Sequence, residues 1–187
     1  MKICILLAVF FAITACSNVD YGNITDPDRL SQSAWTLRGK ISIKYQSQGF
    51  VARFVWKREN SGNKILFRMP FGRYVKVSVK EGLCVLENSE GDLIQAVSLE
   101  SLMMKEMGWS FPIRRAIFWV QGLPYPADTI ENLGDDVRST FKQGEWVVRI
   151  EEYFVDRQVP RKIYFSSGGI EIKIVANEWN FNNGSIK

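Results

Sequence analysis

Residues 36–45 read Thr-Leu-Arg-Gly-Lys-Ile-Ser-Ile-Lys-Tyr, and this stretch decides the fold. The apolar or small residues occupy every second position, at Leu37, Gly39, Ile41, Ile43 and Tyr45. A period of two is typical of an antiparallel strand with one face in the core and the other in solvent. The sequence therefore predicts an antiparallel sheet around this strand.

The same alternation continues through the first half of the chain. A second strand starts at Gly49, and further strands are expected over 64–69, 75–79, 83–87 and 92–97. Turn residues separate them, for example Asn-Ser-Gly-Asn at 60–63 and the pairs Glu-Gly at 81–82 and 90–91. The spacing is that of successive hairpins.

After residue 97 the period becomes helical, and later it returns to two. Ser98 is expected to cap a helix that carries Leu99, Leu102, Met103 and Met107 on one side and ends at Gly108. A second helix runs from Pro112 to Gly122, with Ile113, Ala116, Ile117 and Val120 inward. Strands follow over 137–142, 145–155, 161–166 and 169–176. The fold predicted is mainly β (α+β): a single curved antiparallel sheet with helices over one side.

The N-terminus has the features of a lipoprotein signal peptide. One basic residue, Lys2, precedes an apolar run over 3–13, which is shorter than the roughly 20 residues a spanning helix needs. The run ends in Ile-Thr-Ala-Cys at 13–16, which has the pattern of a lipobox with Cys16 as the lipidated residue. We expect a signal peptide at 1–15, a lipidated tether at 16–25 and one domain at 26–187. An ordinary signal peptide or short anchor, with Cys16 incidental, is the alternative.

Composition limits the possible functions. Cleavage before Cys16 would remove 15 of 187 residues and only one of the 24 basic residues, leaving 23 against 20 acidic ones. This mild excess suits anionic lipid or an acidic partner, and no basic cluster indicates nucleic acid. The chain has no histidine, which removes histidine-based catalysis and metal ligation. Cys84 would be the one free thiol and is expected to be a small buried hydrophobe. We therefore expect neither an enzyme, nor a cofactor, nor a metal.

One turn contains an unusual residue. Pro70-Phe71-Gly72 joins two alternating strands, so Phe71 is expected at a hairpin tip, where a large aromatic side chain is uncommon. Exposure there forgoes roughly 1.5–3 kcal/mol of burial, which contact with acyl chains would restore. Arg68 and Arg73 beside it are suited to lipid phosphates. The alternative is that the loop folds back and Phe71 packs on the sheet.

Large apolar side chains are abundant for a sheet with one covering layer. They are Trp35, Phe54, Trp56, Phe67, Trp109, Phe118, Trp119 and Trp146, together with the flexible Met103, Met104 and Met107. A curved sheet with a lid can enclose an apolar cavity, and methionine surfaces adapt to varied guests. A plain packed core is the alternative, and composition alone favours it. The acidic residues have no arrangement beyond a solvated outer face.

The ordered set of motifs resembles the outer-membrane lipoprotein receptor family LolB. The matching pieces are the lipobox at Cys16, Trp-Thr-Leu-Arg-Gly-Lys-Ile at 35–41, Ala-Arg-Phe-Val-Trp at 52–56, Pro-Phe-Gly at 70–72, Trp119, Gly122, Pro124, Pro126, Trp146, Pro-Arg at 160–161, Ile-Lys-Ile at 172–174 and Trp179. The family usually has leucine where this chain has Phe71. Ser17 follows the cysteine, where an aspartate would mark inner-membrane retention in enteric bacteria.

The resemblance implies a half-open barrel with a helical lid and a cavity for lipoprotein acyl chains. It implies a monomer that is anchored by lipid on the periplasmic face of the outer membrane. Such a protein receives lipoproteins from the periplasmic carrier LolA and inserts them into outer-membrane lipid through Phe71, flanked by Pro70 and Gly72. The side chains expected to line the cavity are Leu37, Ile41, Phe54, Trp56, Ile65, Phe67, Met103, Met107, Ile113, Ile117, Trp146 and Val148. A structural or assembly-scaffold lipoprotein that binds protein partners and has a filled core is the rival interpretation.

Overall fold

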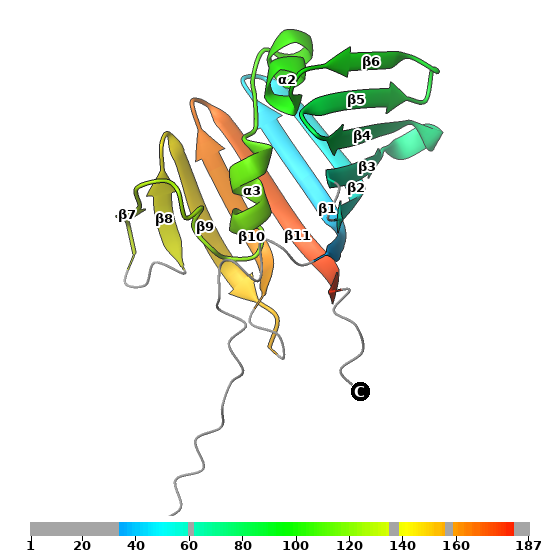
Figure 1. Cartoon of the computed structure of the whole chain (residues 1–187). Coiled ribbons are helices and arrows are strands. Elements are labelled where there is room, and N and C mark those ends of the chain that lie inside the picture. The colour runs from blue at the N-terminus through cyan, green and yellow to red at the C-terminus, as the bar shows by residue number, and fades with distance from the viewer. Residues whose placement is uncertain (1–33, 60–61, 135–138, 156–158, 182–187) are drawn as a thin grey trace, which may run out of the picture.

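The computed structural model describes residues 34–59, 62–134, 139–155 and 159–181, which form one curved sheet with two helices on one side (Figure 1). The sheet has eleven antiparallel strands in the order β6-β5-β4-β3-β2-β1-β11-β10-β9-β8-β7. The expected signal peptide, Cys16 and the tether lie outside the described residues. The strands are β1 Trp35–Tyr45, β2 Gln48–Glu59, β3 Gly62–Arg68, β4 Tyr74–Lys80, β5 Leu83–Asn88, β6 Leu93–Ala96, β7 Glu131–Asn132, β8 Thr140–Gln143, β9 Trp146–Tyr153, β10 Pro160–Ser167 and β11 Ile170–Phe181.

The strand that was predicted first, β1, lies at the centre of the sheet. It pairs with β2 on one side and with the last strand, β11, on the other, so Leu37 lies opposite both Trp56 and Trp179. Its alternate side chains are buried from Trp35 to Ile41, as the period of two predicts. Because β6 and β7 form the two edges and do not pair, the sheet curves without closing, and the predicted half-open architecture is confirmed.

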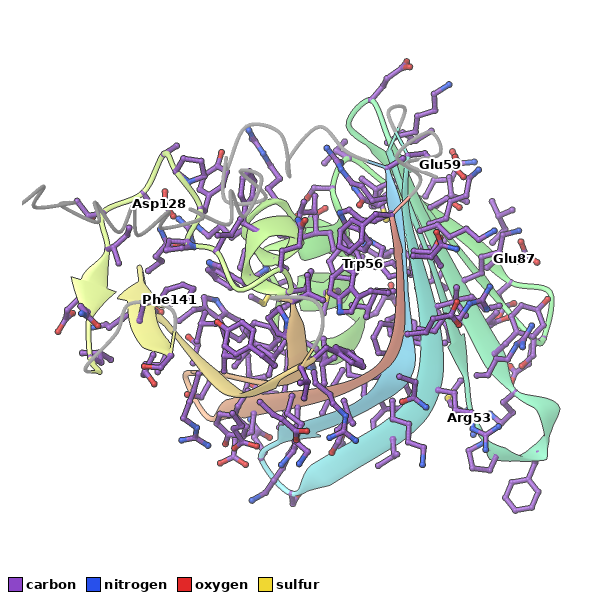
Figure 2. All side chains as sticks on the ribbon, turned by 90° about the horizontal axis from the view of Figure 1, so that it is seen from below. Arg53, Trp56, Glu59, Glu87, Asp128 and Phe141 are labelled. Atoms are coloured by element: carbon purple, nitrogen blue, oxygen red, sulfur yellow. The ribbon has the colours of Figure 1, made fainter. Side chains whose placement is uncertain are left out.

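A bulge in the β1–β11 pair bends the centre of the sheet. The register shifts between Arg38 and Gly39, and a Cβ atom on Gly39 would lie 2.3 Å from the carbonyl oxygen of Val175. Glycine lets the two backbones approach closely at the bulge, which increases local twist. Figure 2 shows the resulting bend, with Trp56 inside it and Arg53 and Glu87 on the outer face.

The same bulge explains an error in the predicted end of the last strand. The alternation breaks at Asn177 and Glu178, so the prediction stopped at Ala176, but β11 resumes the pattern at Trp179 and continues to Phe181. The strand β7 is only two residues long and was not predicted. A pair of residues carries too little periodicity to be recognised.

Both predicted helices are present and lie on the concave side of the sheet (Figure 1). Helix α2, Leu99–Met107, begins after Ser98, whose side chain accepts a hydrogen bond from the Ser101 amide, and ends at Gly108 with φ 74°. Helix α3, Ile113–Trp119, begins after Pro112 and buries five of its seven residues. A helix that is apolar nearly all round belongs in a core.

Two aromatic groups form the centre of the core. In the first, the ring of Trp35 meets those of Trp56 and Trp179 edge-to-face, with centroids 5.2 and 5.3 Å apart. In the second, Phe111 contacts Trp146 and Phe165 at 5.3 and 5.5 Å, below α3. Cys84 is fully buried in β5, as expected.

Candidate functional site

The hairpin between β3 and β4 places Phe71 at its tip. A short turn of 3-10 helix, Pro70–Gly72, connects the strands, and the amide of Met69 donates a hydrogen bond to the carbonyl of Arg73 at 2.9 Å. The side chain of Phe71 is 100% exposed. The loop therefore does not fold back onto the sheet, and the second of the two alternatives for this side chain is wrong.

The backbone of Phe71 is strained. Its φ of 60° and ψ of 31° lie in the left-handed region, which is uncommon for a bulky residue. An L-residue in this region costs about 1–2 kcal/mol relative to a right-handed conformation. Gly72 follows with φ 74°, which glycine adopts without a penalty. Exposure and strain therefore coincide at this residue, an arrangement that is common at functional sites.

The concave face near this hairpin is only partly covered. Inward-facing apolar side chains on six neighbouring strands stay half-buried, although each packs against the core. We call this set the apolar trough: Ile43, Phe50, Phe67, Val75, Leu86, Ile94 and, from α2, Met103. Phe50 and Phe67 meet edge-to-face at 6.3 Å. A long apolar surface that its own fold leaves half-covered is suited to an apolar ligand.

Most of the side chains expected to line a cavity lie in the packed core. Phe67 and Met103 belong to the apolar trough, and the side chain of Met107 lies outside the described part of the chain. The others are buried: Leu37, Ile41, Phe54, Trp56, Ile65, Ile113, Ile117, Trp146 and Val148. In the conformation described, these nine contribute to the core, and their contact with acyl chains remains a prediction.

Helix α3 is fixed to the sheet by a buried glutamine. The Oε1 atom of Gln143 accepts hydrogen bonds from the Trp119 indole and the Tyr125 amide, both at 2.7 Å, and its Nε2 donates to the Tyr125 carbonyl at 2.8 Å. An ion pair between Arg115 and Asp128, at 2.5 Å, joins α3 to the loop that follows it. Because both polar atoms of this fully buried amide form hydrogen bonds, they fix α3 and Tyr125 to β8.

Helix α2 is attached more loosely. Its Glu100 carboxylate accepts a hydrogen bond from the Ile113 amide at 3.1 Å, and the Tyr45 hydroxyl donates to the Gly108 carbonyl at 3.4 Å. Leu99 and Leu102 are buried, but Met104 is 53% exposed. Of the two helices, α2 covers the apolar trough, and its hydrogen bonds, at 3.1 and 3.4 Å, are longer than the 2.7 Å bond from Trp119 that holds α3.

Sequence reasoning missed two residues that organise the site. Gln143 lies two positions after the buried Phe141 on β8, so a polar residue at an inward position was a readable signal. Phe111 precedes α3 outside any periodic segment, and nothing in its neighbourhood marks it as the ring that joins Trp146 to Phe165.

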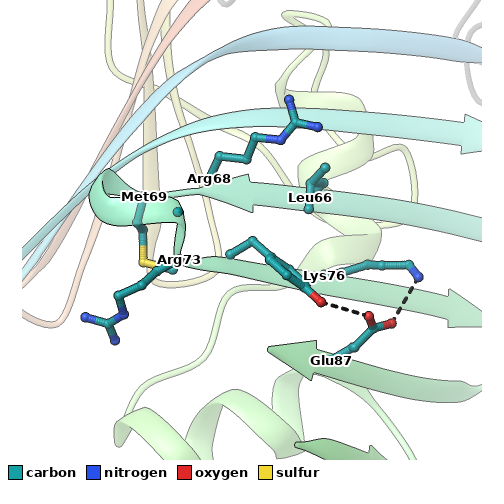
Figure 3. A pocket seen from close by; sticks show the side chains of 8 residues that line it. Leu66, Arg68, Met69, Arg73, Lys76 and Glu87 are labelled. Atoms are coloured by element: carbon teal, nitrogen blue, oxygen red, sulfur yellow. Dashed lines mark hydrogen bonds and ion pairs between the residues drawn. The ribbon is translucent and has the colours of Figure 1, made fainter. Parts of the chain in front are cut away.

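The outer, convex face has two hollows beside the hairpin. One has a volume of about 530 Å³ and is lined by residues of β3, β4, β5 and the turn between β3 and β4, including Arg68, Arg73 and Glu87 (Figure 3). There Glu87 accepts hydrogen bonds from Lys76 at 3.0 Å and from the Tyr74 hydroxyl at 3.2 Å. These bonds, with that to Lys76 first, lower the pKa of the Glu87 carboxyl. The other hollow, about 1000 Å³, extends across β1, β2 and β3.

Within the described residues, no helix has the length and apolar content needed to cross a bilayer.

Curated relatives match over most of the chain. An outer-membrane lipoprotein LolB of Chromobacterium violaceum is 26% identical over 180 residues, covering 94% of this chain and 97% of that protein. One from Coxiella burnetii is 27% identical over 163 residues, covering 82% and 74%, and one from Chromohalobacter salexigens is 28% identical over 151 residues, covering 78% and 70%.

Solved structures with a similar fold are more distant in sequence. A LolA superfamily protein from Nitrosomonas europaea has a TM-score of 0.48 and 9% identity, covering 82% of this chain and 88% of that chain. A putative outer membrane lipoprotein-sorting protein domain from Vibrio parahaemolyticus has a TM-score of 0.45 and 10% identity, with coverage of 82% and 87%.

The family model described as outer membrane lipoprotein LolB matches residues 33–179, which span the whole sheet up to Trp179 and both helices. The chain therefore belongs to the LolB family of outer-membrane lipoproteins.

Proposed function

We propose that this chain accepts lipoproteins from the periplasmic carrier LolA by their acyl chains and inserts them into the outer membrane. LolB proteins are lipoprotein transport proteins and not enzymes, so the proposal concerns binding and transfer alone. It also includes lipidation of Cys16, anchoring at the periplasmic face, and action as a monomer in a domain that extends over 26–187.

The observation that supports this proposal most is the continuity of apolar surface from the trough to the hairpin tip. Phe67 faces inward on β3, Met69 packs half-buried against the core two residues later, and Phe71 is exposed two residues beyond that. Phe67 is the last inward residue of β3, and Met69 and Phe71 follow within the next four residues, so the three apolar side chains lie at the same end of the sheet. An acyl chain in the trough would lie next to the residue that contacts the bilayer.

The direction of transfer follows from affinity alone. Without a chemical fuel, each step must be downhill, and a tenfold preference requires about 1.4 kcal/mol. The trough must therefore bind acyl chains more tightly than the carrier does, and the bilayer more tightly than the trough. Insertion of Phe71 would bring the protein to the lipid phase and allow release there.

Transfer of a labelled lipoprotein from LolA to the purified protein, and then to liposomes, tests the proposal. We expect Phe71→Glu to accept lipoprotein but fail to insert it, whereas Phe71→Leu, which keeps an apolar tip, does both. Normal insertion by the glutamate variant would refute the assigned role.

A scaffold lipoprotein with a filled core is the second candidate, and the tightly packed region beneath α3 favours it. Binding of a fluorescent long-chain fatty acid separates the two. We expect Leu86→Gln, in the trough, to weaken binding, and Leu83→Gln, at an outward position of the same strand, to leave it unchanged. If the unaltered protein binds no fatty acid, the scaffold interpretation is favoured.

A further inference from the structure

A row of like charges crosses the convex face beside the hairpin. Lys40 on β1 lies directly opposite Arg53 on β2, and Arg53 lies directly opposite Arg68 on β3. All three are exposed, and Arg73 adds a fourth cation just after the tip. Directly opposite residues have Cβ atoms about 5 Å apart, where like charges destabilise a sheet. We call Lys40, Arg53, Arg68 and Arg73 the cationic row.

Nothing in the described part of the chain neutralises the cationic row. None of its four members forms an ion pair there, whereas the nearby acids are already occupied. Glu87 pairs with Lys76 at 3.0 Å, and Glu178 pairs with Arg38 at 3.5 Å. The described charges beside the hairpin therefore sum to a net positive charge.

The other half of the convex face is organised differently. Glu151 lies between Arg149 and Lys173, at 3.1 and 3.2 Å, and Glu152 pairs with Arg161 and with Lys162, the latter at 2.7 Å. These four cations, on β9, β10 and β11, thus all have acidic partners on β9. Opposite charges usually lie next to each other on a sheet surface, so the unpaired cationic row indicates an anionic ligand outside the domain.

Three members of the cationic row line a hollow that reaches the hairpin. The hollow of about 1000 Å³ is bordered by Lys40, Arg53 and Arg68, and at its far end by Met69 and Pro70. Val51, also on its wall, is 63% exposed. Single apolar side chains among basic ones are typical of surfaces that rest on a bilayer, where long basic side chains reach the phosphates.

We propose that the convex face of β1–β3 docks on anionic phospholipid, with the cationic row on the phosphates and Phe71 in the acyl region. Strands lie about 4.8 Å apart, so Lys40, two strands from Arg68, is about 10 Å away from it. All four cations can therefore meet one patch of headgroups. An acidic protein would need a broader apolar centre for a stable interface, whereas the exposed apolar groups here are single side chains. The inference rests on the proposed function for the role of Phe71.

Binding to vesicles without any lipoprotein tests the docking surface. The chain from residue 16 onward contains every described element, and Cys16→Ala removes the site for a lipid anchor. We would measure flotation with vesicles of phosphatidylglycerol and phosphatidylcholine in equal parts, and with phosphatidylcholine alone. The test variant is Arg53→Gln/Arg68→Gln. The matched control is Lys57→Gln/Lys64→Gln, which removes another directly opposite pair from the same strands and face.

The two pairs differ in their distance from the tip. Lys64 precedes Arg68 by four residues, about 13 Å along the strand and beyond the screening length at physiological salt. Each basic residue at an anionic surface strengthens binding about fivefold, so loss of Arg53 and Arg68 should weaken it about thirtyfold. The control pair should weaken binding less than fivefold, and about 1 M salt should remove the difference.

Three results would overturn the inference: equal binding to both vesicle types, equal losses from both pairs, or unchanged vesicle binding with weaker binding to LolA. The last would assign the row to an acidic protein. Failure of the proposed function is distinguishable, because lipoprotein transfer would then be absent while charge-dependent docking persists.

Discussion

Substitutions at Phe71 separate the backbone strain at the hairpin tip from the proposed contact of the ring with the membrane. Asparagine tolerates the left-handed region because its short polar side chain can hydrogen-bond locally, whereas phenylalanine and leucine do not. Phe71→Asn should therefore relieve the strain at φ 60° and remove the apolar ring, and Phe71→Leu should keep both the strain and an apolar tip.

Phe71→Asn should raise the stability of the fold and lower the affinity for the membrane. The ring is 100% exposed, so its removal leaves no cavity and loses no packing in the folded domain. Relief of strain should raise the free energy of unfolding by about 1 kcal/mol, which corresponds to about 2–4 °C for a domain of this size. At the membrane, loss of a phenylalanine contact forgoes roughly 1.5–3 kcal/mol, or about ten- to a hundredfold in partition.

Thermal unfolding followed by circular dichroism measures the first effect, and vesicle flotation with lipoprotein insertion measures the second. We expect Phe71→Asn to melt higher than the unaltered protein and to insert poorly. Phe71→Leu should resemble the unaltered protein in both assays.

Two outcomes would refute the reasoning. A loss of stability above about 1 kcal/mol in Phe71→Asn would mean that the ring packs on the domain. Insertion at the normal rate by that variant would mean that another part of the surface contacts the membrane.

Other predictions concern the fold that holds the hairpin. Gly39→Ala should lower the free energy of unfolding, measured with denaturant, by more than about 2 kcal/mol, because its Cβ would lie 2.3 Å from the Val175 carbonyl oxygen. Gln143→Leu should lower the free energy of unfolding, measured with denaturant, by about 3 kcal/mol, because it leaves the Trp119 indole and three backbone groups without this partner. The pKa of the Glu151 carboxyl is lowered in the folded state, mainly by its hydrogen bond to Lys173. The stabilisation from this carboxylate is therefore complete above its unfolded-state pKa of about 4.3 and is lost as the pH falls through its folded-state pKa. Glu151→Gln removes the group that titrates, so denaturant unfolding at decreasing pH should show a smaller loss of stability for the variant than for the unaltered protein.

The sequence predicted the sheet, both helices and most strand ends, because those features depend on local periodicity. Ser98 and Gly108 begin and end α2 as expected from capping rules alone. The alternation in β1 identified the strand that became the centre of the sheet. Its pairing with β11 joins residues far apart in the chain, and no local pattern specifies such a partner.

The site was less predictable because it depends on how distant parts of the chain lie relative to one another. The exposure of Phe71 depends on which way the turn points, and an exposed and a folded-back ring give the same pattern of residues. Whether an inward residue such as Leu86 or Val148 is covered depends on where α2 and α3 lie across the sheet. The cationic row became visible only with the register, because Lys40, Arg53 and Arg68 are 13 and 15 positions apart in sequence.

The two halves of the concave face differ, and only the half beneath α2 leads to the hairpin tip. Beneath α3, Gln143 and the aromatic group around Phe111 leave a rigid, filled core. Beneath α2, the trough is half-covered and leads along β3 to Phe71, over at most four residues or about 13 Å. One leaflet of a bilayer's hydrocarbon core is about 15 Å thick, so an acyl chain of that length would reach from the trough to the tip. It would leave the trough at Phe67, whose neighbour Arg68 faces the other side of β3, so the tail would start from the uncharged face of the strand.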